Sequence, residues 1–282
     1  MFHHFGYHNS FIVKSPMPLF QIITLAIIQG VTEFLPVSSS GHLVITSGLL
    51  GWKDQGLMID VGVHIGTLGA VIFYLREDLK KMVCGVLAST QGKKNDGAAL
   101  AKWVFIASLP VFLSGFLVAW FIQEGVRNPE IIGWAFIIFG VLLYLSDKYG
   151  YQKRSIQQMS SKDALKIGLA QAFAIIPGTS RAGVTITMAR FLGYDRRESA
   201  RFSMLLSVPA ILGAATLLGL DLSGDQRSFF EFSTALAAGI SFLTALIAIY
   251  LMMGWLRRQT FTPFVLYRVL MGVFILFLAE QI

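Results

Sequence analysis

The stretch Leu35-Pro-Val-Ser-Ser-Ser-Gly-His42 interrupts one apolar segment, and Ile176-Pro-Gly-Thr-Ser-Arg-Ala-Gly183 interrupts another, half the chain later. The prolines of the two stretches lie 141 positions apart, and a hydroxyl follows each at the third position, at Ser39 and Ser180. Interrupted hydrophobic segments at matching positions of two halves indicate a polar site between inverted repeats, near the membrane midplane. We therefore expect the function to lie where the two loops meet.

The composition is that of an integral membrane protein. Hydrophobic residues make up 55% of the 282 positions, charged residues make up 14%, and the mean hydropathy is +0.65. Soluble domains carry about a quarter charged residues. Apolar runs near the bilayer-spanning length of about 20 residues predict six transmembrane helices, centred on 60–75, 103–121, 130–146, 198–220, 232–255 and 262–279.

Four further apolar segments flank the two loops and are too short to cross a bilayer, or are broken at the proline: 19–37, 42–52, 164–177 and 182–193. Irregular backbone at membrane depth is tolerated only where protein buries it or where it lines a cavity. We therefore expect an all-α polytopic membrane protein with six transmembrane helices and two re-entrant helix–loop–helix hairpins.

One hairpin and three crossings fall in each half, and an odd number of crossings inverts the second copy. The sequence thus predicts an inverted-topology repeat within one membrane domain, 17–282, with the first repeat at about 17–146 and the second at about 163–282. Residues 1–16 fit neither half, so we expect a disordered or non-native extension there.

The basic residues predict the orientation. Alternate loops place 17 of the 23 Lys and Arg residues on one side: Arg76, Lys80, Lys81, Lys93, Lys94, Lys102, Lys148, Lys153, Arg154, Lys162, Lys166, Arg190, Arg196, Arg197, Arg201, Arg257 and Arg258. The positive-inside rule makes that side cytoplasmic, so both termini are expected outside. The net charge of +7 therefore reflects topology, and no nucleic-acid partner is expected.

Ionisable groups inside apolar segments are candidates for function, because burying one in hydrocarbon is costly unless it is paired or hydrated. Glu33 follows Gln29 by four residues, on the same helical face. A carboxylate beside an amide oxygen and hydroxyls suits a hard cation such as Mg²⁺ or Ca²⁺. The alternative is a salt bridge between Glu33 and Arg181.

The remaining candidates belong to the loops themselves. The Arg181 guanidinium at the start of a half-helix suits a phosphate group, or it fixes the loop by bonding carbonyls. His42 can exchange a proton near neutral pH, or it is structural. The loop hydroxyls can face substrate or cap helices; they are Ser38, Ser39, Ser40, Thr179 and Ser180.

The motifs resemble those of a known family. Gln29-Gly-Val-Thr-Glu-Phe-Leu-Pro-Val-Ser-Ser-Ser-Gly-His42 and Pro177-Gly-Thr-Ser-Arg-Ala-Gly-Val-Thr185 resemble the two signatures of the undecaprenyl-diphosphate phosphatase family, the bacitracin-resistance (BacA/UppP) type. The resemblance runs from about Met17 to the C-terminus. Two departures are Gln29, where many members have Glu, and Ala182, where a serine is common.

The resemblance implies a multi-pass enzyme of the bacterial inner membrane that converts undecaprenyl diphosphate to undecaprenyl phosphate for peptidoglycan synthesis and so confers bacitracin resistance. It implies dependence on Mg²⁺ or Ca²⁺, held by Glu33 and Gln29. It places catalysis on Ser39, His42 and Glu33. Diphosphate binding falls to Arg181, Ser180, Thr179 and Ser38.

We expect Ser39 to be the nucleophile, with His42 as its proton acceptor or as the acid for the leaving group. Attack by a metal-activated water is the alternative. A secondary transporter or polyprenyl-phosphate flippase is the competing function, because paired broken helices are also transporter architecture. A homodimer is left open.

Overall fold

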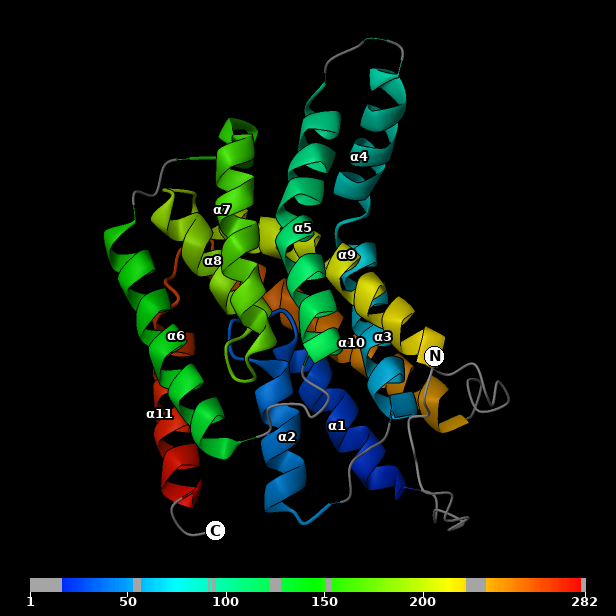
Figure 1. The fold of residues 1–282 in the computed structure, drawn as a ribbon, viewed down its shortest axis with the longest axis vertical. Coiled ribbons are helices and arrows are strands. Elements are labelled where there is room, and N and C mark those ends of the chain that lie inside the picture. The colour runs from blue at the N-terminus through cyan, green and yellow to red at the C-terminus, as the bar shows by residue number, and fades with distance from the viewer. Residues whose placement is uncertain are drawn as a thin grey trace.

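The computed structural model describes residues 17–52, 57–90, 92, 95–121, 128–150, 154–221 and 232–279, so the expected extension at 1–16 lies outside them. The regular structure in these ranges is almost entirely helical (Figure 1). Its α-helices are α1 (Leu19–Thr32), α2 (Ser39–Leu49), α3 (Leu57–Tyr74), α4 (Arg76–Ser89), α5 (Asp96–Phe121), α6 (Pro129–Tyr149), α7 (Ser161–Ala172), α8 (Arg181–Phe191), α9 (Arg196–Asp221), α10 (Phe232–Trp255) and α11 (Thr262–Ala279).

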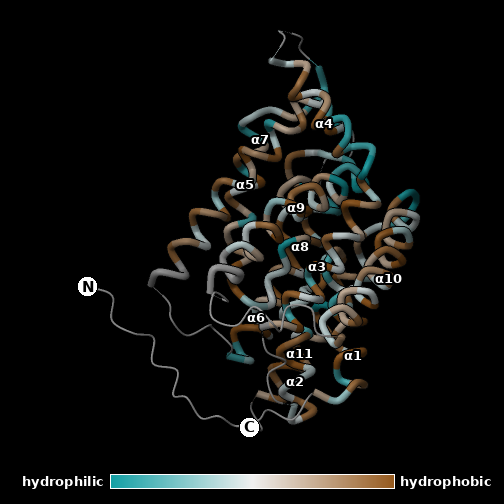
Figure 2. The backbone as a smooth tube through the Cα atoms, turned by 90° about the vertical axis from the view of Figure 1, so that its right-hand side faces the viewer, coloured by the Kyte–Doolittle hydropathy of each residue, from teal (hydrophilic) through white to brown (hydrophobic). Residues whose placement is uncertain are grey.

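Five of these helices, α5, α6, α9, α10 and α11, are long and apolar enough to cross a membrane. The apolar α3 meets the criterion for a sixth span only together with α4, and the two are bent by 75°. All six apolar segments expected from the sequence lie in helices, and hydrophilic residues gather around α4 (Figure 2). The chain is therefore an all-helical, multi-pass membrane protein.

The two short-helix hairpins, α1–α2 and α7–α8, each pack against a long helix from the other half of the chain. Helix α1 lies on α10, and α7 lies on α5. Glycines permit this close approach: a Cβ at Gly30 of α1 would lie 1.9 Å from the Thr244 hydroxyl oxygen. A Cβ at Gly168 of α7 would lie 2.5 Å from the Ala107 carbonyl oxygen. The halves interlock through their hairpins.

Ion pairs anchor the second hairpin at its ends. The buried Asp147 carboxylate of α6 accepts from Arg190 Nε at 3.1 Å and from Arg196 Nε at 2.7 Å. At the start of α7, Asp163 accepts from Arg154 at 2.7 Å and from the Tyr194 hydroxyl at 2.9 Å. Burial tends to raise the pKa of Asp163, but the hydrogen bonds from Arg154 and Tyr194 lower it below its usual value. This network holds α7 and α8 in place.

Candidate active site

The two loops between the hairpin helices end in a similar way. Ser38 and Ser180 both have φ 71°, and each is the N-cap of an eleven-residue helix, α2 or α8. The Ser38 hydroxyl accepts from the Gly41 amide at 3.4 Å, and the Ser180 hydroxyl accepts from the Gly183 amide at 3.1 Å. A capping serine satisfies one of the free amides of a first helical turn, so these two hydroxyls shape the loops.

This geometry corrects the sequence alignment of the halves by one residue. Matching the prolines paired Ser39 with Ser180, whereas matching conformations pairs Ser38 with Ser180 and therefore Ser39 with Arg181. The second loop carries one more residue between its proline and its cap, which hides the register in the sequence. Ser39 of the first hairpin thus stands where the second hairpin has the guanidinium of Arg181.

One buried arginine donates hydrogen bonds to both loops. Arg268 of α11 is fully buried, and its guanidinium donates to the carbonyls of Pro36 at 3.1 Å, Gly178 at 3.0 Å and Thr179 at 3.0 Å. It also donates to two carbonyls of α6, each at 3.2 Å. Five donors in a fixed plane suit such a set of acceptors. Arg268 was not among the expected site residues, although a charged residue inside the expected span 262–279 is itself a signal. Its contact with Pro36, 232 positions away, could not be inferred from the sequence.

The carboxylate of Glu33 accepts hydrogen bonds from three polar side chains of the site. Its Oε2 accepts from the Ser39 hydroxyl at 2.7 Å and from Gln29 Nε2 at 2.9 Å. Its Oε1 accepts from Arg181 Nη2 at 3.0 Å. Arg181 donates a second bond to the Ser203 carbonyl at 3.2 Å. The salt-bridge alternative for Glu33 and Arg181 is therefore observed, and it brings the two hairpins together.

The two ring nitrogens of His42 bond groups other than the Ser39 hydroxyl, which the sequence led us to expect as the donor of a proton to His42. Its Nδ1 lies 2.6 Å from the Ser38 carbonyl oxygen, and its Nε2 lies 2.5 Å from the Tyr267 hydroxyl oxygen. The His42 and Tyr267 rings also stack, with centroids 5.5 Å apart. Because a carbonyl only accepts, Nδ1 carries a proton. The hydrogen-bond partner of Ser39 is Glu33 instead, and Tyr267 is a site residue that the sequence reasoning missed.

The second hairpin lacks the carboxylate. Gln171 of α7 matches Gln29 in the corrected register, but the position that matches Glu33 is Ile175. Both amide atoms of the fully buried Gln171 have no hydrogen-bond partner, and neither does the hydroxyl of the fully buried Thr179. Thr179 contributes its carbonyl to Arg268 instead. The serine–carboxylate pair therefore exists only in the first hairpin.

The donor set fits a hard divalent cation in part. Gln29 Oε1 is a buried oxygen without a hydrogen-bond partner, and it belongs to the residue that bonds Glu33. No group of three His, Cys, Asp or Glu side chains suited to a metal occurs among the described residues. Mg²⁺ commonly uses one or two carboxylates together with substrate phosphates and water, so this pair is compatible with an ion that arrives with the substrate.

The fold and the site together define an integral membrane enzyme with a serine, a carboxylate and a guanidinium inside an apolar helical bundle. The chain belongs to the family described as bacitracin resistance protein BacA, which matches residues 22–274. It is 46% identical to Undecaprenyl-diphosphatase of Jannaschia sp. (strain CCS1) over 265 residues, which cover 93% of this chain and 99% of that protein. It is 47% identical to Undecaprenyl-diphosphatase 1 of Rhodospirillum rubrum over 271 residues, which cover 93% and 96%. The family expected from the motifs is confirmed.

Proposed function

We propose that this chain hydrolyses undecaprenyl diphosphate to undecaprenyl phosphate and inorganic phosphate. It would thereby recycle the lipid carrier of peptidoglycan synthesis and confer resistance to bacitracin. The observation that carries this proposal is the 2.7 Å bond from the Ser39 hydroxyl to Glu33, with Arg181 on the same carboxylate. A hydroxyl bonded to a base beside a guanidinium is the arrangement of nucleophilic attack on phosphorus.

In the proposed reaction, Ser39 Oγ attacks the terminal phosphorus and its proton passes to Glu33. The bond from that phosphorus to the bridging oxygen breaks, and undecaprenyl phosphate leaves. Water then attacks the phosphoserine, which releases inorganic phosphate and restores the hydroxyl. The 2.7 Å contact between Ser39 and Glu33 supports the first proton transfer, because a general base must lie within hydrogen-bond reach of its proton.

Arg181 would hold the diphosphate. A guanidinium has five N–H donors, so its bonds to Glu33 and Ser203 leave others for phosphate oxygens. The first-turn amides of α2 and α8 have no intrahelical acceptor and favour an anion. His42, held by Tyr267, would orient or protonate the leaving oxygen.

We propose Glu33 and Gln29 as the protein ligands of a divalent cation, Mg²⁺ or Ca²⁺. When bound, the ion would neutralise charge on the phosphate oxygens. The unpaired Gln29 Oε1 beside the Glu33 carboxylate supports this assignment.

We also infer that both hairpins are re-entrant, that six helices cross the bacterial inner membrane, and that the halves form an inverted repeat with periplasmic termini. The matching conformations at Ser38 and Ser180 and the reciprocal packing of α1 on α10 and α7 on α5 support the repeat. The basic loops support the orientation.

The test is phosphate release from undecaprenyl diphosphate by the purified protein in detergent, with Mg²⁺ or Ca²⁺ and with a chelator. Wild type should release phosphate only with the cation, and Ser39→Ala should be inactive. Ser40→Ala is the matched control, because it removes a neighbouring exposed hydroxyl. Full activity of Ser39→Ala, with no phosphoserine after a rapid quench of wild type, would contradict the serine mechanism. Absence of any release by wild type would contradict the function.

A further inference from the structure

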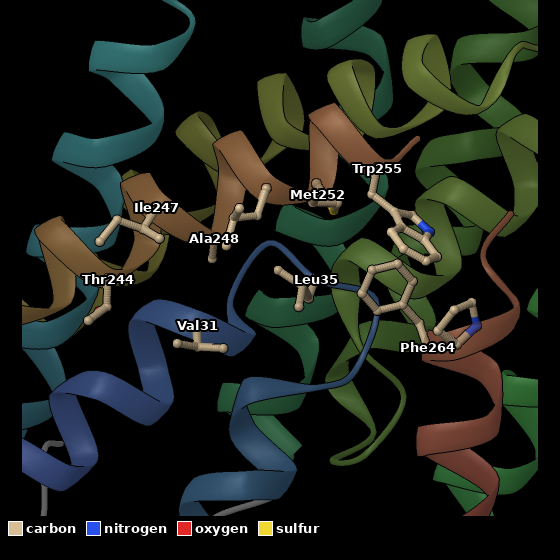
Figure 3. Close-up of a pocket in the computed structure, with 10 residues that line it drawn as sticks. Val31, Leu35, Thr244, Ile247, Ala248, Met252, Trp255 and Phe264 are labelled. Carbon is tan, nitrogen blue, oxygen red and sulfur yellow. The ribbon is translucent and has the colours of Figure 1, made fainter. Parts of the chain in front are cut away.

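An apolar groove lies beside the first loop, between the end of α1, the second half of α10 and the start of α11 (Figure 3). Its volume is 380 Å³. The residues that line it include Val31, Leu35, Ala248, Met252, Trp255 and Phe264. A hollow of this size holds a short stretch of an apolar chain.

The walls of the groove are fixed before anything binds. At one end, α1 and α10 are in contact, where Gly30 leaves no room for a Cβ against Thr244. At the other end, the Trp255 indole N–H donates to the Thr260 carbonyl at 3.0 Å, which holds the ring in place. The groove is therefore preformed, and a ligand would not have to order it.

The groove has no polar group to offer a ligand. Its one hydroxyl, that of Thr244, donates to the Ile240 carbonyl at 2.9 Å. On its outer edge, Ile247 is 58% exposed and Leu251 is 69% exposed, so the groove opens on the side that faces lipid. These properties select a long hydrocarbon and exclude a charged or hydrogen-bonding ligand.

The groove also borders the polar site. Leu35, which lines it, follows Glu33 by two residues in the same loop. Helix α11 also links the groove to the polar site. Phe264 lines the groove, and Tyr267, three residues later, lies on the same face of the helix. Tyr267 in turn bonds His42. A lipid whose charged head lies at Ser39 and Arg181 would have its first hydrocarbon units at this groove.

We propose that this groove binds the first isoprenoid units of the polyprenyl diphosphate, next to the scissile head group, an assignment that rests on the proposed function. Leaving the bilayer for the groove gives the tail little hydrophobic gain, since both surroundings are apolar. The groove therefore recognises the tail by packing. A substitution that fills the groove tests the proposal more directly than one that shortens a lining side chain.

The test uses Ile247→Trp, which adds an indole at the groove edge, and Leu243→Trp as its control. Leu243 lies one turn earlier on α10, is 59% exposed and does not line the groove. Each protein receives a polyprenyl diphosphate with a photoreactive group in its first isoprenoid units, and the labelled residues are identified by mass spectrometry. KM and kcat for undecaprenyl diphosphate are measured in parallel.

We expect wild type and Leu243→Trp to be labelled between Ile247 and Trp255 and at Phe264. Ile247→Trp should lose this labelling, with KM raised about tenfold and kcat unchanged, as expected when packing of a few units is lost. Labelling elsewhere, equal effects of the two variants, or labelling by a photoreactive phospholipid that the substrate does not displace would overturn the proposal. Failure of the hydrolase function would instead appear as absent phosphate release by wild type.

Discussion

The guanidinium of Arg181 and the carboxylate of Glu33 lie 3.0 Å apart, although 148 positions separate them in the chain. Both are largely buried, with side-chain exposures of 14% and 7%. Each charge compensates the other in an apolar interior, where neither would be stable alone. Because the two residues come from different hairpins, the pair couples the assembly of the site to the docking of the two halves.

Replacing Arg181 should therefore impair both binding and stability. We expect Arg181→Ala to lower kcat/KM by roughly a hundredfold to a thousandfold, the usual cost of losing a charge-stabilising donor, and to lower the melting temperature by leaving Glu33 unpaired. Phosphate release and thermal unfolding in detergent measure the two effects. Arg181→Lys, which keeps the charge but not the planar fork, should restore stability more than activity. Equal activity of Arg181→Ala and wild type would contradict the assignment.

Substitutions of the adjacent residues Ser38 and Ser39 should have different effects, one on helix capping and the other on catalysis. Ser39→Ala should abolish turnover with only a small change in the melting temperature, because the Glu33 carboxylate loses the Ser39 bond but keeps those from Arg181 and Gln29. Ser38→Ala should cost about 1 kcal/mol of stability through the lost cap. Ser38→Asn keeps a capping group and tolerates positive φ, so it should recover most of that loss. The opposite pattern, with Ser38 needed for turnover and Ser39 only for stability, would refute this division.

The Tyr267 hydroxyl should affect the rate more than the fold. Tyr267→Phe keeps the ring stacked on His42 but removes the bond to Nε2, so we expect kcat to fall about tenfold, as when general acid–base catalysis is weakened. KM and the melting temperature should hardly change. Tyr144→Phe, on α6 away from His42, is a suitable control. If Tyr267→Phe changed KM alone, the tyrosine would contact the substrate instead of positioning His42.

Arg268 should be mainly structural. Arg268→Met would leave the loop carbonyls of Pro36, Gly178 and Thr179 without this donor, at about 1 kcal/mol or more for each buried group that stays unsatisfied. The two carbonyls of α6 would lose only a second bond, because they lie inside the helix. We expect a large drop in the melting temperature in detergent and loss of activity. Arg268→Lys supplies three donors, so its melting temperature should lie between those of wild type and Arg268→Met. A melting temperature unaffected by Arg268→Met would show that the loops are held by other contacts.

Much of the fold could be predicted from the sequence. The apolar runs located α3, α5, α6, α9, α10 and α11, and the proline-broken segments located α1, α2, α7 and α8. These signals are local, since hydrophobicity and helix-breaking residues act within a few positions of themselves. The bend between α3 and α4 was not predicted, because an apolar run says nothing about the direction in which the next helix continues.

The sequence by itself determined where the two loops lie and that the charged residues Glu33 and Arg181 lie in or beside them within apolar segments. Only the tertiary structure decided which groups meet: Ser39 with Glu33, His42 with Tyr267, and Arg268 with both loops. It also showed that Ser38, and not Ser39, matches Ser180 in backbone conformation, which shifts the comparison of the two hairpins by one residue. The physical reason is that capping and helix propensity act locally, whereas a buried charge is satisfied by whichever partner the packing of distant helices brings near.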